Sequence, residues 1–277
     1  MSNYRPTGFS VLPLVIKNLF ILNGLFLLAT FLFQNQGIDL YDFLGLHFPA
    51  SEKFRPYQLI TYLFMHADIH HLVSNMISLW IFGAMLENYW GPKRFLVYYL
   101  LTGIGAAVLH YTILYYHSFA PILAQLNAYP GYHSPAQFIE FFDTLPKMPF
   151  SDAMQVLSDN YNTILKTNPN PTALMAASDE ILVRYREDLL NIPLIVGASG
   201  SVFGVLLAYG MTFPDSYPFL FFPIKAKWIV ILYGASELYA ELHSAQGDNV
   251  AHWGHLGGML FGFILIKYWQ RKSNRFN

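Results

Sequence analysis

The stretch Gly197-Ala198-Ser199-Gly200-Ser201-Val202-Phe203-Gly204 places a serine between two glycines and continues as an apolar segment with small residues four apart. In a membrane helix, small residues at that spacing let a second backbone approach closely. The stretch His255-Leu256-Gly257-Gly258-Met259-Leu260-Phe261-Gly262 repeats the pattern and begins with a histidine. Two such helices in contact bring a hydroxyl and an imidazole within hydrogen-bond reach, which activates a serine as a nucleophile. The alternative is that the glycines serve packing alone.

The composition predicts a polytopic membrane protein. Of 277 residues, 54% are hydrophobic and 12% are charged, against about 25% charged in a soluble domain. A net charge of −1 argues against nucleic acid as a partner. With no cysteine there is no disulfide, thiolate metal site or cysteine nucleophile. The first apolar run lacks a small-residue cleavage site, so we interpret it as a retained span and not a signal peptide.

Apolar runs of about 20 residues mark membrane spans. The sequence predicts six of them, at 18–36, 69–87, 95–116, 197–213, 228–244 and 251–268. The fourth is short, and we expect it to begin near Pro193. The fifth carries Glu237 and Glu241 in its second half, which requires that end to emerge into water or to face the bundle interior. The predicted fold is therefore an all-α bundle of six spans forming one membrane domain.

The orientation follows from Lys and Arg near the span ends, which collect on the cytoplasmic side. Four basic groups fall on one side: Arg5 and Lys17; Lys93 and Arg94; Lys225 and Lys227; Lys267, Arg271, Lys272 and Arg275. Acidic residues lean to the other side, with Lys53 and Arg55 as exceptions: Asp39, Asp42, Glu52, Asp68 and Asp248. Both termini are thus predicted to be cytoplasmic. Ser199 and His255 then share a depth near the outer side, as a catalytic pair requires.

The second predicted span adds polar groups at the same level. His71 and Asn75 stand four residues apart and so share a helical face, with His66 five residues earlier. An imidazole and a carboxamide can stabilise an oxyanion, and the Ser199 N–H at a helix start would be a third donor. The alternative is that these side chains only hold helices together. Glu87, at the cytoplasmic end, is predicted to be structural, tying loop backbone to the span.

Taken together, these motifs resemble the rhomboid family of intramembrane serine proteases, of the bacterial six-span type. The motifs are His66, His71-x-x-x-Asn75, Gly83-x-x-x-Glu87, Gly197-x-Ser199-Gly200 and His255-x-x-Gly258-x-x-x-Gly262. The resemblance covers the second, fourth and sixth spans by motif and the rest by topology. It implies a six-helix rhomboid fold with a water-filled cavity opening outward. It also implies cleavage of transmembrane segments of other proteins.

The resemblance implies a role for each matched residue. Ser199 corresponds to the nucleophile, His255 to the general base, and His71 and Asn75 to the oxyanion donors. The supporting positions are His66, Phe203, Gly197, Gly200 and Gly258. The family works with a serine–histidine dyad, and no carboxylate in the sequence is an obvious third member.

Two positions depart from the family pattern. The Trp-Arg pair of the first loop is replaced by Tyr57-Gln58, and the tyrosine four residues after the nucleophile is replaced by Phe203. Since both positions keep an aromatic ring, these departures affect orientation and leave the predicted activity in place. Two rivals also remain. His252 lies one helical turn before His255, which is preferred because glycines follow it three and seven residues on. Ser201 lies about 200° around the helix from Ser199.

The segment 117–192 separates residues 1–116, holding the first three spans, from residues 193–277, holding the last three. It carries four Lys/Arg against eight Asp/Glu and predicts two to four short amphipathic helices on the outer face. Ser134-Pro135-Ala136-Gln137 has the pattern of a helix start with a capping box. Helical spacing continues over 152–166 and 172–190, broken by Asn168-Pro169-Asn170-Pro171. The helices could cover the cavity, bind a partner or be structural decoration.

The sequence therefore favours an intramembrane serine endopeptidase of a bacterial cytoplasmic membrane, acting on transmembrane protein substrates within the lipid bilayer, without cofactor or metal. The sequence predicts no particular oligomeric state. One alternative is a non-catalytic escort of transmembrane helices, which would be expected to lack Ser199 or His255. The other is a metal hydrolase, although HExxH is absent. Its candidate ligands are His66, His70, His71, His252 and His255, with Asp68 or Asp248 as a carboxylate.

Overall fold

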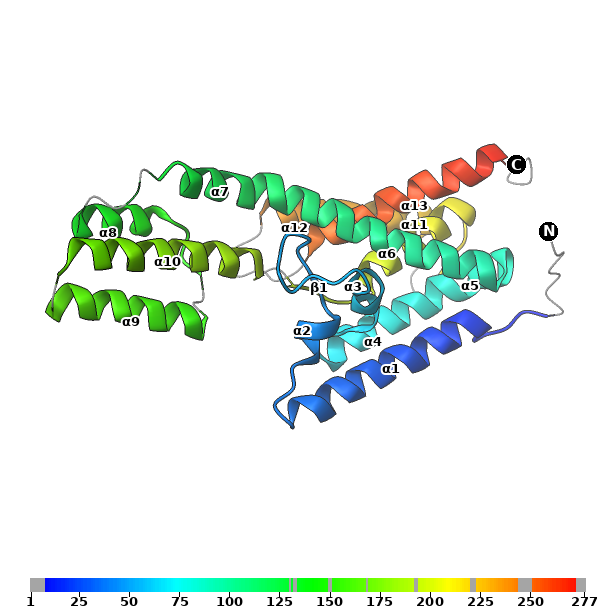
Figure 1. Ribbon diagram of the computed structural model, residues 1–277. Coiled ribbons are helices and arrows are strands. Elements are labelled where there is room, and N and C mark those ends of the chain that lie inside the picture. The colour runs from blue at the N-terminus through cyan, green and yellow to red at the C-terminus, as the bar shows by residue number, and fades with distance from the viewer. Residues whose placement is uncertain are drawn as a thin grey trace. The chain divides into compact units, whose positions relative to one another are not determined.

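The protein is described by a computed structural model (Figure 1), which covers residues 8–129, 131, 134–148, 151–167, 169–191, 194–219, 223–243 and 251–272. These residues are mostly helical. Several residues used in the sequence analysis lie outside the described part: Arg5, Asn168, Pro193, Asp248 and Arg275.

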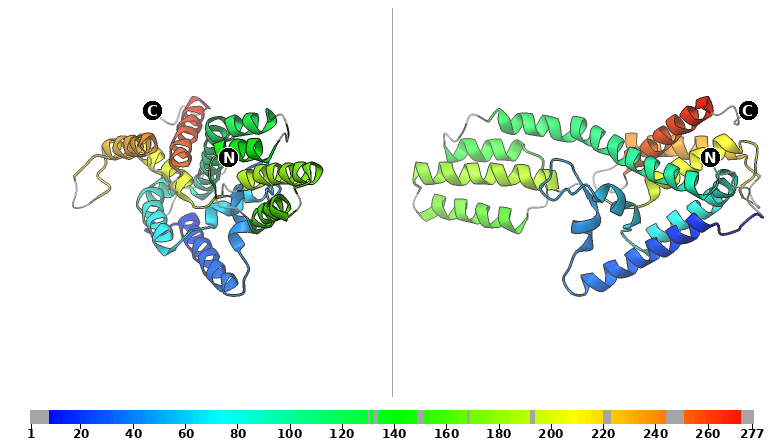
Figure 2. Two further views of the ribbon diagram at one scale, coloured as in Figure 1. Left: turned by 90° about the vertical axis from the view of Figure 1, so that its left-hand side faces the viewer. Right: turned by 45° about the vertical axis from the view of Figure 1, so that its right-hand side comes forward.

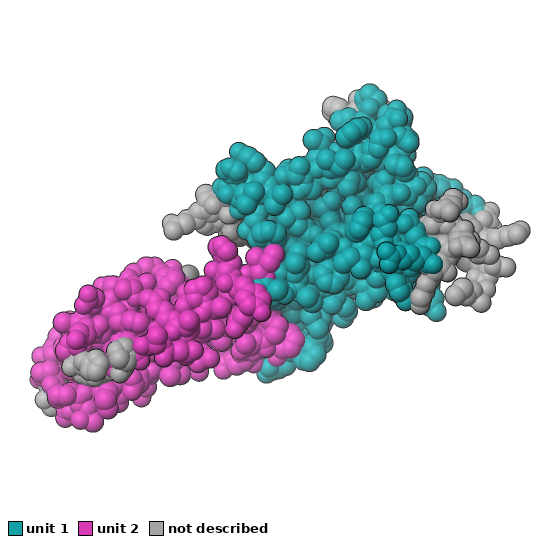
Figure 3. Space-filling view, turned by 90° about the horizontal axis from the view of Figure 1, so that it is seen from above, with its two compact units in different colours: residues 1–46, 55–112, 195–277 teal, residues 47–54, 113–194 magenta. Residues whose placement is uncertain are grey.

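The chain divides into two compact units, coloured separately in Figure 3. The first unit comprises residues 1–46, 55–112 and 195–277. The second comprises residues 47–54 and 113–194. The predicted insertion thus belongs to a compact unit that begins a few residues earlier than expected and includes eight residues of the first loop, 47 to 54. All the candidate site residues belong to the first unit.

Three helices among the described residues are long and apolar enough to cross a membrane. They are α1 (Leu14–Gln34), the continuous helix Ile69–Trp90 and the continuous helix Pro92–Asn127. The second is made of α4 (Ile69–Ser78), a π segment η2 (Leu79–Gly83) and α5 (Ala84–Trp90). The third is made of α6 (Pro92–Leu114), a π segment η3 (Tyr115–Phe119) and α7 (Ala120–Asn127). This third helix runs well past residue 116, where its predicted span ends.

The other three predicted spans also coincide with helices. These are α11 (Ser199–Thr212), which is apolar but shorter, α12 (Ala226–Leu242) and α13 (His252–Lys272). Because these three helices do not combine the length and the apolar composition of the first three, the total of six spans stays a prediction. Two short strands, β1 (Leu46–His47) and β2 (Leu194–Ile195), pair in a small sheet that an all-α prediction omits.

The connection from α1 to α4 is held by buried polar contacts. It contains α2 (Leu40–Leu44), α3 (Gln58–Thr61) and the 3-10 turn η1 (Tyr62–Phe64). The buried Gln58 amide donates to the Phe43 carbonyl at 3.2 Å and accepts from the Arg55 N–H at 3.0 Å. Tyr57, its neighbour, is half exposed. The Tyr62 carbonyl accepts the Gly197 N–H at 3.0 Å, which ties this connection to the backbone just before Ser199.

Glu87 joins the first two apolar helices. Its carboxylate accepts the Val15 N–H at 2.8 Å and the Ile16 N–H at 3.0 Å. These amides belong to the first turn of α1, whose N-cap residue Pro13 offers no side-chain cap. A carboxylate at a helix N-terminus satisfies orphan donors and complements the helix dipole. Glu87, for which the sequence predicts a structural role, thus holds the backbone of the first turn of α1.

Helices α11 and α13 pack closely against each other (Figure 1). A Cβ added to Gly258 would overlap the carbonyl oxygen of Gly200, and a Cβ on Gly262 would lie 3.5 Å from the Cα of Gly204. The predicted contact between the two glycine-bearing helices is therefore confirmed. Gly200 and Gly204 also let α6 approach α11. A Cβ on Gly200 would lie 2.5 Å from the Cβ of Ala106, and a Cβ on Gly204 would lie 2.7 Å from the Cβ of Thr102. The glycines of α11 thus admit two neighbours.

The second unit has its own core. Its helices α8 (Pro135–Thr144), α9 (Asp152–Thr167) and α10 (Pro171–Asn191) lie within 117–192, where the sequence predicts two to four short helices, and α10, with 21 residues, is not short. Ser134 caps α8 by accepting the Gln137 N–H, as its capping pattern predicts. Helices α9 and α10 lie side by side (Figures 1 and 2). The buried core is formed by Phe138, Leu145, Met154, Tyr161, Leu174, Ala177, Ile181 and Tyr185.

We predict that Gly258→Ala destabilises the folded protein by about 2 kcal/mol or more, because its methyl group would push α13 away from the α11 backbone. Gly254→Ala is the matched control on the same helix, since its Cβ would meet only Ala251 at an ordinary 3.6 Å. Thermal unfolding in detergent should show a clear loss for the first variant and little change for the second. Equal stability of the two variants would contradict the close packing.

Candidate active site

The serine and histidine predicted to pair lie within hydrogen-bond distance. Ser199 is the first residue of α11, and His255 lies in the first turns of α13. The Oγ of Ser199 and the Nε2 of His255 are 2.9 Å apart. The ring of Phe203, one turn after Ser199, stacks on the His255 ring with a centroid distance of 4.3 Å and an interplanar angle of 6°. Phe203 therefore fixes the plane of the imidazole against the helix that carries the hydroxyl.

A carboxylate stands on the other side of this imidazole. The Oε2 of Glu237, in α12, lies 2.7 Å from the Nδ1 of His255 and 2.6 Å from the Nδ1 of His252. This corrects the sequence analysis, which identified no carboxylate beside the pair. Glu237 is 18 residues from His255 and on a different helix, so no periodicity connects them. The sequence does offer one indication, because a carboxylate within an apolar segment costs free energy unless it faces the protein interior.

The two rivals predicted from the sequence occupy other positions. His252 does not replace His255 beside the serine but shares its carboxylate. Ser201 is fully buried, and its Oγ donates to the Tyr99 carbonyl at 2.7 Å. Ser201 therefore points toward α6, as its angle around the helix predicts.

Gly197 leaves room for the imidazole of His71, in α4, to lie close to Ser199. Its φ of 116° lies in the region that favours glycine. A Cβ at this position would lie 2.8 Å from the Nε2 of His71 and 3.8 Å from the Oγ of Ser199. The imidazole of His71 and the hydroxyl of Ser199 thus flank the same glycine. Asp68 begins α4 by accepting the His71 N–H at 2.7 Å, and this bond lowers the pKa of the exposed Asp68 carboxyl.

His66 holds the carboxamide of Asn75. The Nε2 of His66 lies 3.1 Å from the Nδ2 of Asn75, and its Nδ1 lies 3.4 Å from the Phe64 carbonyl. Burial, with a smaller contribution from nearby His71, lowers the pKa of His66 to about 4. The ring is therefore neutral at neutral pH, so Nε2 can accept from the amide while Nδ1 donates. One N–H of Asn75 remains for another acceptor.

Among the described residues, Glu237, His252 and His255 form a group whose side-chain atoms lie close enough together to be considered as metal ligands. Those atoms, on Glu237, His252 and His255, lie within 4.8 Å of one another. Zinc ligands about 2.1 Å from a tetrahedral ion stand roughly 3.3 Å apart. The separations of 2.6 and 2.7 Å instead have the length of hydrogen bonds. The larger histidine set of the metal-hydrolase alternative, with His66, His70 and His71, does not converge with this group.

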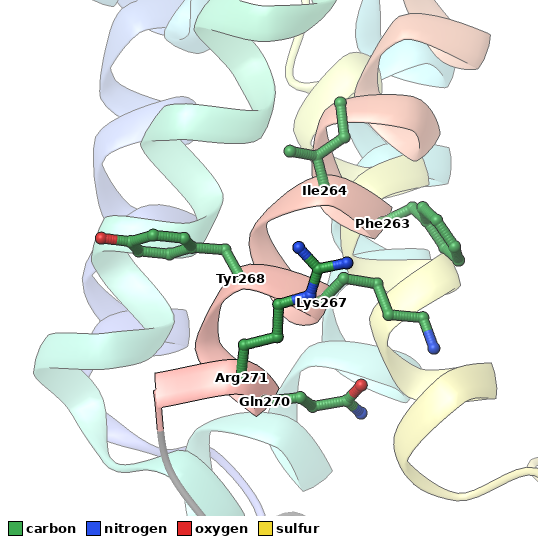
Figure 4. Close-up of a pocket in the computed structure, with 6 residues that line it drawn as sticks. All are labelled: Phe263, Ile264, Lys267, Tyr268, Gln270 and Arg271. Carbon is green, nitrogen blue, oxygen red and sulfur yellow. The ribbon is translucent and has the colours of Figure 1, made fainter.

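A surface hollow of about 780 Å³ lies toward the other end of α13 (Figure 4). Its lining residues are Phe263, Ile264, Lys267, Tyr268, Gln270 and Arg271. It contains none of the residues around Ser199, so this hollow plays no part in the site.

The apolar helices define the class of protein, a helical membrane protein, and the partly buried contacts among Ser199, His255 and Glu237 define its candidate site. Residues 53–124 and 171–272, more than half of the chain, match the Rhomboid domain family. The chain therefore belongs to the rhomboid family, which includes serine proteases, and is a polytopic membrane protein.

Relatives match over parts of the chain. Rhomboid-like protein 11, chloroplastic, of Arabidopsis thaliana is 40% identical over 31% of this chain and 29% of its own length. An uncharacterized mitochondrial rhomboid protein of Schizosaccharomyces pombe is 23% identical over 91% of this chain and 64% of its own length. Rhomboid protease GluP of Bacillus subtilis is 34% identical over 22% of this chain and 12% of its own length. The chain thus spans less than two thirds of each of these relatives.

We predict that acidification destabilises the fold through His66. Its pKa is about 4 when folded and near 6.5 in an unfolded chain. Between these values the unfolded chain binds more protons, so the free energy of unfolding falls as the pH drops from 6.5 to 4. The contribution is roughly 3 kcal/mol at most. In detergent melts, the His66→Gln variant should lose less stability than wild type over this range. The exposed His70→Gln control should behave as wild type, and identical pH dependence of all three would contradict the prediction.

Proposed function

We propose that this protein is an intramembrane serine endopeptidase that cleaves transmembrane segments of other membrane proteins near the outer membrane face. The observation that carries the proposal is the 2.9 Å separation between the Oγ of Ser199 and the Nε2 of His255. Membership of a family that includes serine proteases supports it. So do relatives that are themselves named proteases, in Toxoplasma gondii and Bacillus subtilis.

The proposed reaction begins when a substrate helix enters from the lipid and unwinds locally, so that its freed backbone groups meet water or the enzyme. The Oγ of Ser199 attacks the scissile carbonyl carbon while the Nε2 of His255 takes the hydroxyl proton. His255 returns this proton to the leaving amine as the peptide C–N bond breaks. A water molecule, deprotonated by the same imidazole, then attacks the acyl-enzyme and releases the new carboxyl end with Ser199 restored.

The oxyanion formed in each step needs donors that are in place beforehand. We assign this role to the His71 imidazole, the Asn75 carboxamide and the Ser199 N–H. Two contacts support the assignment. His71 and the Ser199 hydroxyl flank Gly197, and the bond from Asn75 to His66 leaves one amide N–H of Asn75 for a substrate.

The proposal includes six spans with both termini in the cytoplasm of a bacterial cell, and the segment 117–192 on the outer face. The distribution of Lys and Arg supports this orientation. The Bacillus subtilis relative supports a bacterial setting, whereas the Arabidopsis and Schizosaccharomyces relatives carry chloroplast and mitochondrial names. Transmembrane protein substrates and the lipid bilayer are the partners that this placement implies.

The first test is cleavage of a labelled single-span substrate in liposomes by wild type and by active-site variants. Ser199→Ala and His255→Ala should abolish cleavage, because one removes the attacking oxygen and the other its proton acceptor. His252→Ala should leave a measurable rate. Cleavage by Ser199→Ala would overturn the proposal. Activity in His255→Ala with none in His252→Ala would overturn the assignment of the base.

Asn75→Ala should slow cleavage by about 10²- to 10³-fold, the usual effect of removing one oxyanion donor. The folded protein should persist, because the variant leaves the glycine contacts between α11 and α13 untouched. The rate is measured with the same substrate, and folding is checked by thermal melting in detergent. An unchanged rate would remove Asn75 from the site.

A further inference from the structure

The three-residue group on α12 and α13 adds to the proposed dyad, and the inference below rests on the proposed protease function. We propose that Glu237 is a positioning residue that completes a Ser199–His255–Glu237 triad, and that His252 holds this carboxylate in place. The observation is that one oxygen, Oε2 of Glu237, lies within hydrogen-bond distance of Nδ1 on both imidazoles.

Burial makes this arrangement consequential. The side chains of Glu237, His252 and His255 are 14%, 9% and 13% exposed. A carboxylate in such surroundings costs free energy unless it is paired and hydrogen-bonded. An ionisable residue within an apolar helix is therefore a candidate functional residue, and its role depends on the group to which it is hydrogen-bonded. Here the partners of Glu237 are the imidazole that contacts Ser199 and a second imidazole one turn away.

The carboxylate selects the tautomer that the reaction needs. An ionised carboxylate only accepts hydrogen bonds, so the Nδ1 of His255 must carry the proton that it donates to Glu237. The Nε2 of a neutral His255 then has a free lone pair toward the hydroxyl of Ser199. With the other tautomer the proton would lie between Nε2 and the serine, and the ring could not accept the Oγ proton.

The carboxylate also supplies charge when the proton moves. As Ser199 attacks, its proton passes from Oγ to Nε2 and His255 becomes an imidazolium, while Glu237 keeps its negative charge. The facing groups are Phe203, which is neutral, and three further imidazoles, His252 of α13, His71 of α4 and His110 of α6. None of these four side chains is an anion, so the carboxylate of Glu237 supplies the negative charge that stabilises the imidazolium.

His252 fixes the position of the Glu237 carboxylate. A glutamate side chain has three rotatable bonds, and a single hydrogen bond to a ring that changes charge would hold it loosely. The second bond, 2.6 Å from the Nδ1 of His252, fixes Oε2 from the same helix that carries His255. Because His252 acts at one remove from the serine, its loss should lower the rate without abolishing it.

The test compares kcat and KM of the full chain in liposomes for wild type, Glu237→Gln, Glu237→Asp and the control Glu241→Gln, which removes a carboxylate one turn along the same helix. Glu237→Gln should lower kcat about 10²-fold, within the range of general acid–base effects, and change KM less than about two-fold. Glu237→Asp should recover part of the rate, and Glu241→Gln should match wild type.

A Glu237→Gln enzyme with wild-type kcat would overturn the triad, while an inactive Ser199→Ala would still uphold the proposed function. Cleavage by Ser199→Ala would instead overturn the proposed function itself. If Glu237→Gln fails to fold, the ¹⁵N spectrum of histidine-labelled wild type decides, with the His255 signals assigned by their loss in His255→Ala. A neutral His255 protonated on Nδ1 supports the triad, and one protonated on Nε2 overturns it.

Discussion

The contact between the backbones of α11 and α13 is the constraint on which the site depends. Where Gly258 passes the carbonyl oxygen of Gly200, even a methyl group would separate the two helices. Ser199 lies one residue before this crossing and His255 lies three residues before it. Because both side chains approach from the same end of the contact, their 2.9 Å separation follows from the helix register. A wider crossing would leave a serine and a histidine in the same chain without a bond between them.

Around this crossing, buried polar groups are used to place other polar groups. The carboxylate of Glu87 holds the first turn of α1, the imidazole of His66 holds the amide of Asn75, and the carboxylate of Glu237 holds His255. Each of these bonds offsets a burial cost that an apolar side chain would avoid. In an apolar bundle such bonds fix orientation better than packing does, because an imidazole or a carboxamide works only when the correct atom faces its partner.

The sequence predicts much of this arrangement because glycine spacing and helix register are local properties. It pairs Ser199 with His255, directs Ser201 elsewhere and predicts the helices at 152–166 and 172–190. It does not predict the contact between Glu237 and His255, since contacts between α12 and α13 depend on how two separate helices pack. It also ends the third span near 116, whereas the helix continues to Asn127. Pro121, which has no N–H to donate, lies inside this continuous helix, directly after the π segment Tyr115–Phe119.

The central claim is that His255 activates Ser199, and the reactivity of the serine tests it most directly. Purified full-length protein would be treated with a fluorophosphonate and the modified residue located by peptide mass spectrometry. The account predicts modification of Ser199 in wild type, at a rate about 10²-fold or more above that of His255→Ala. Equal rates in the two proteins, or modification at Ser201, would contradict it.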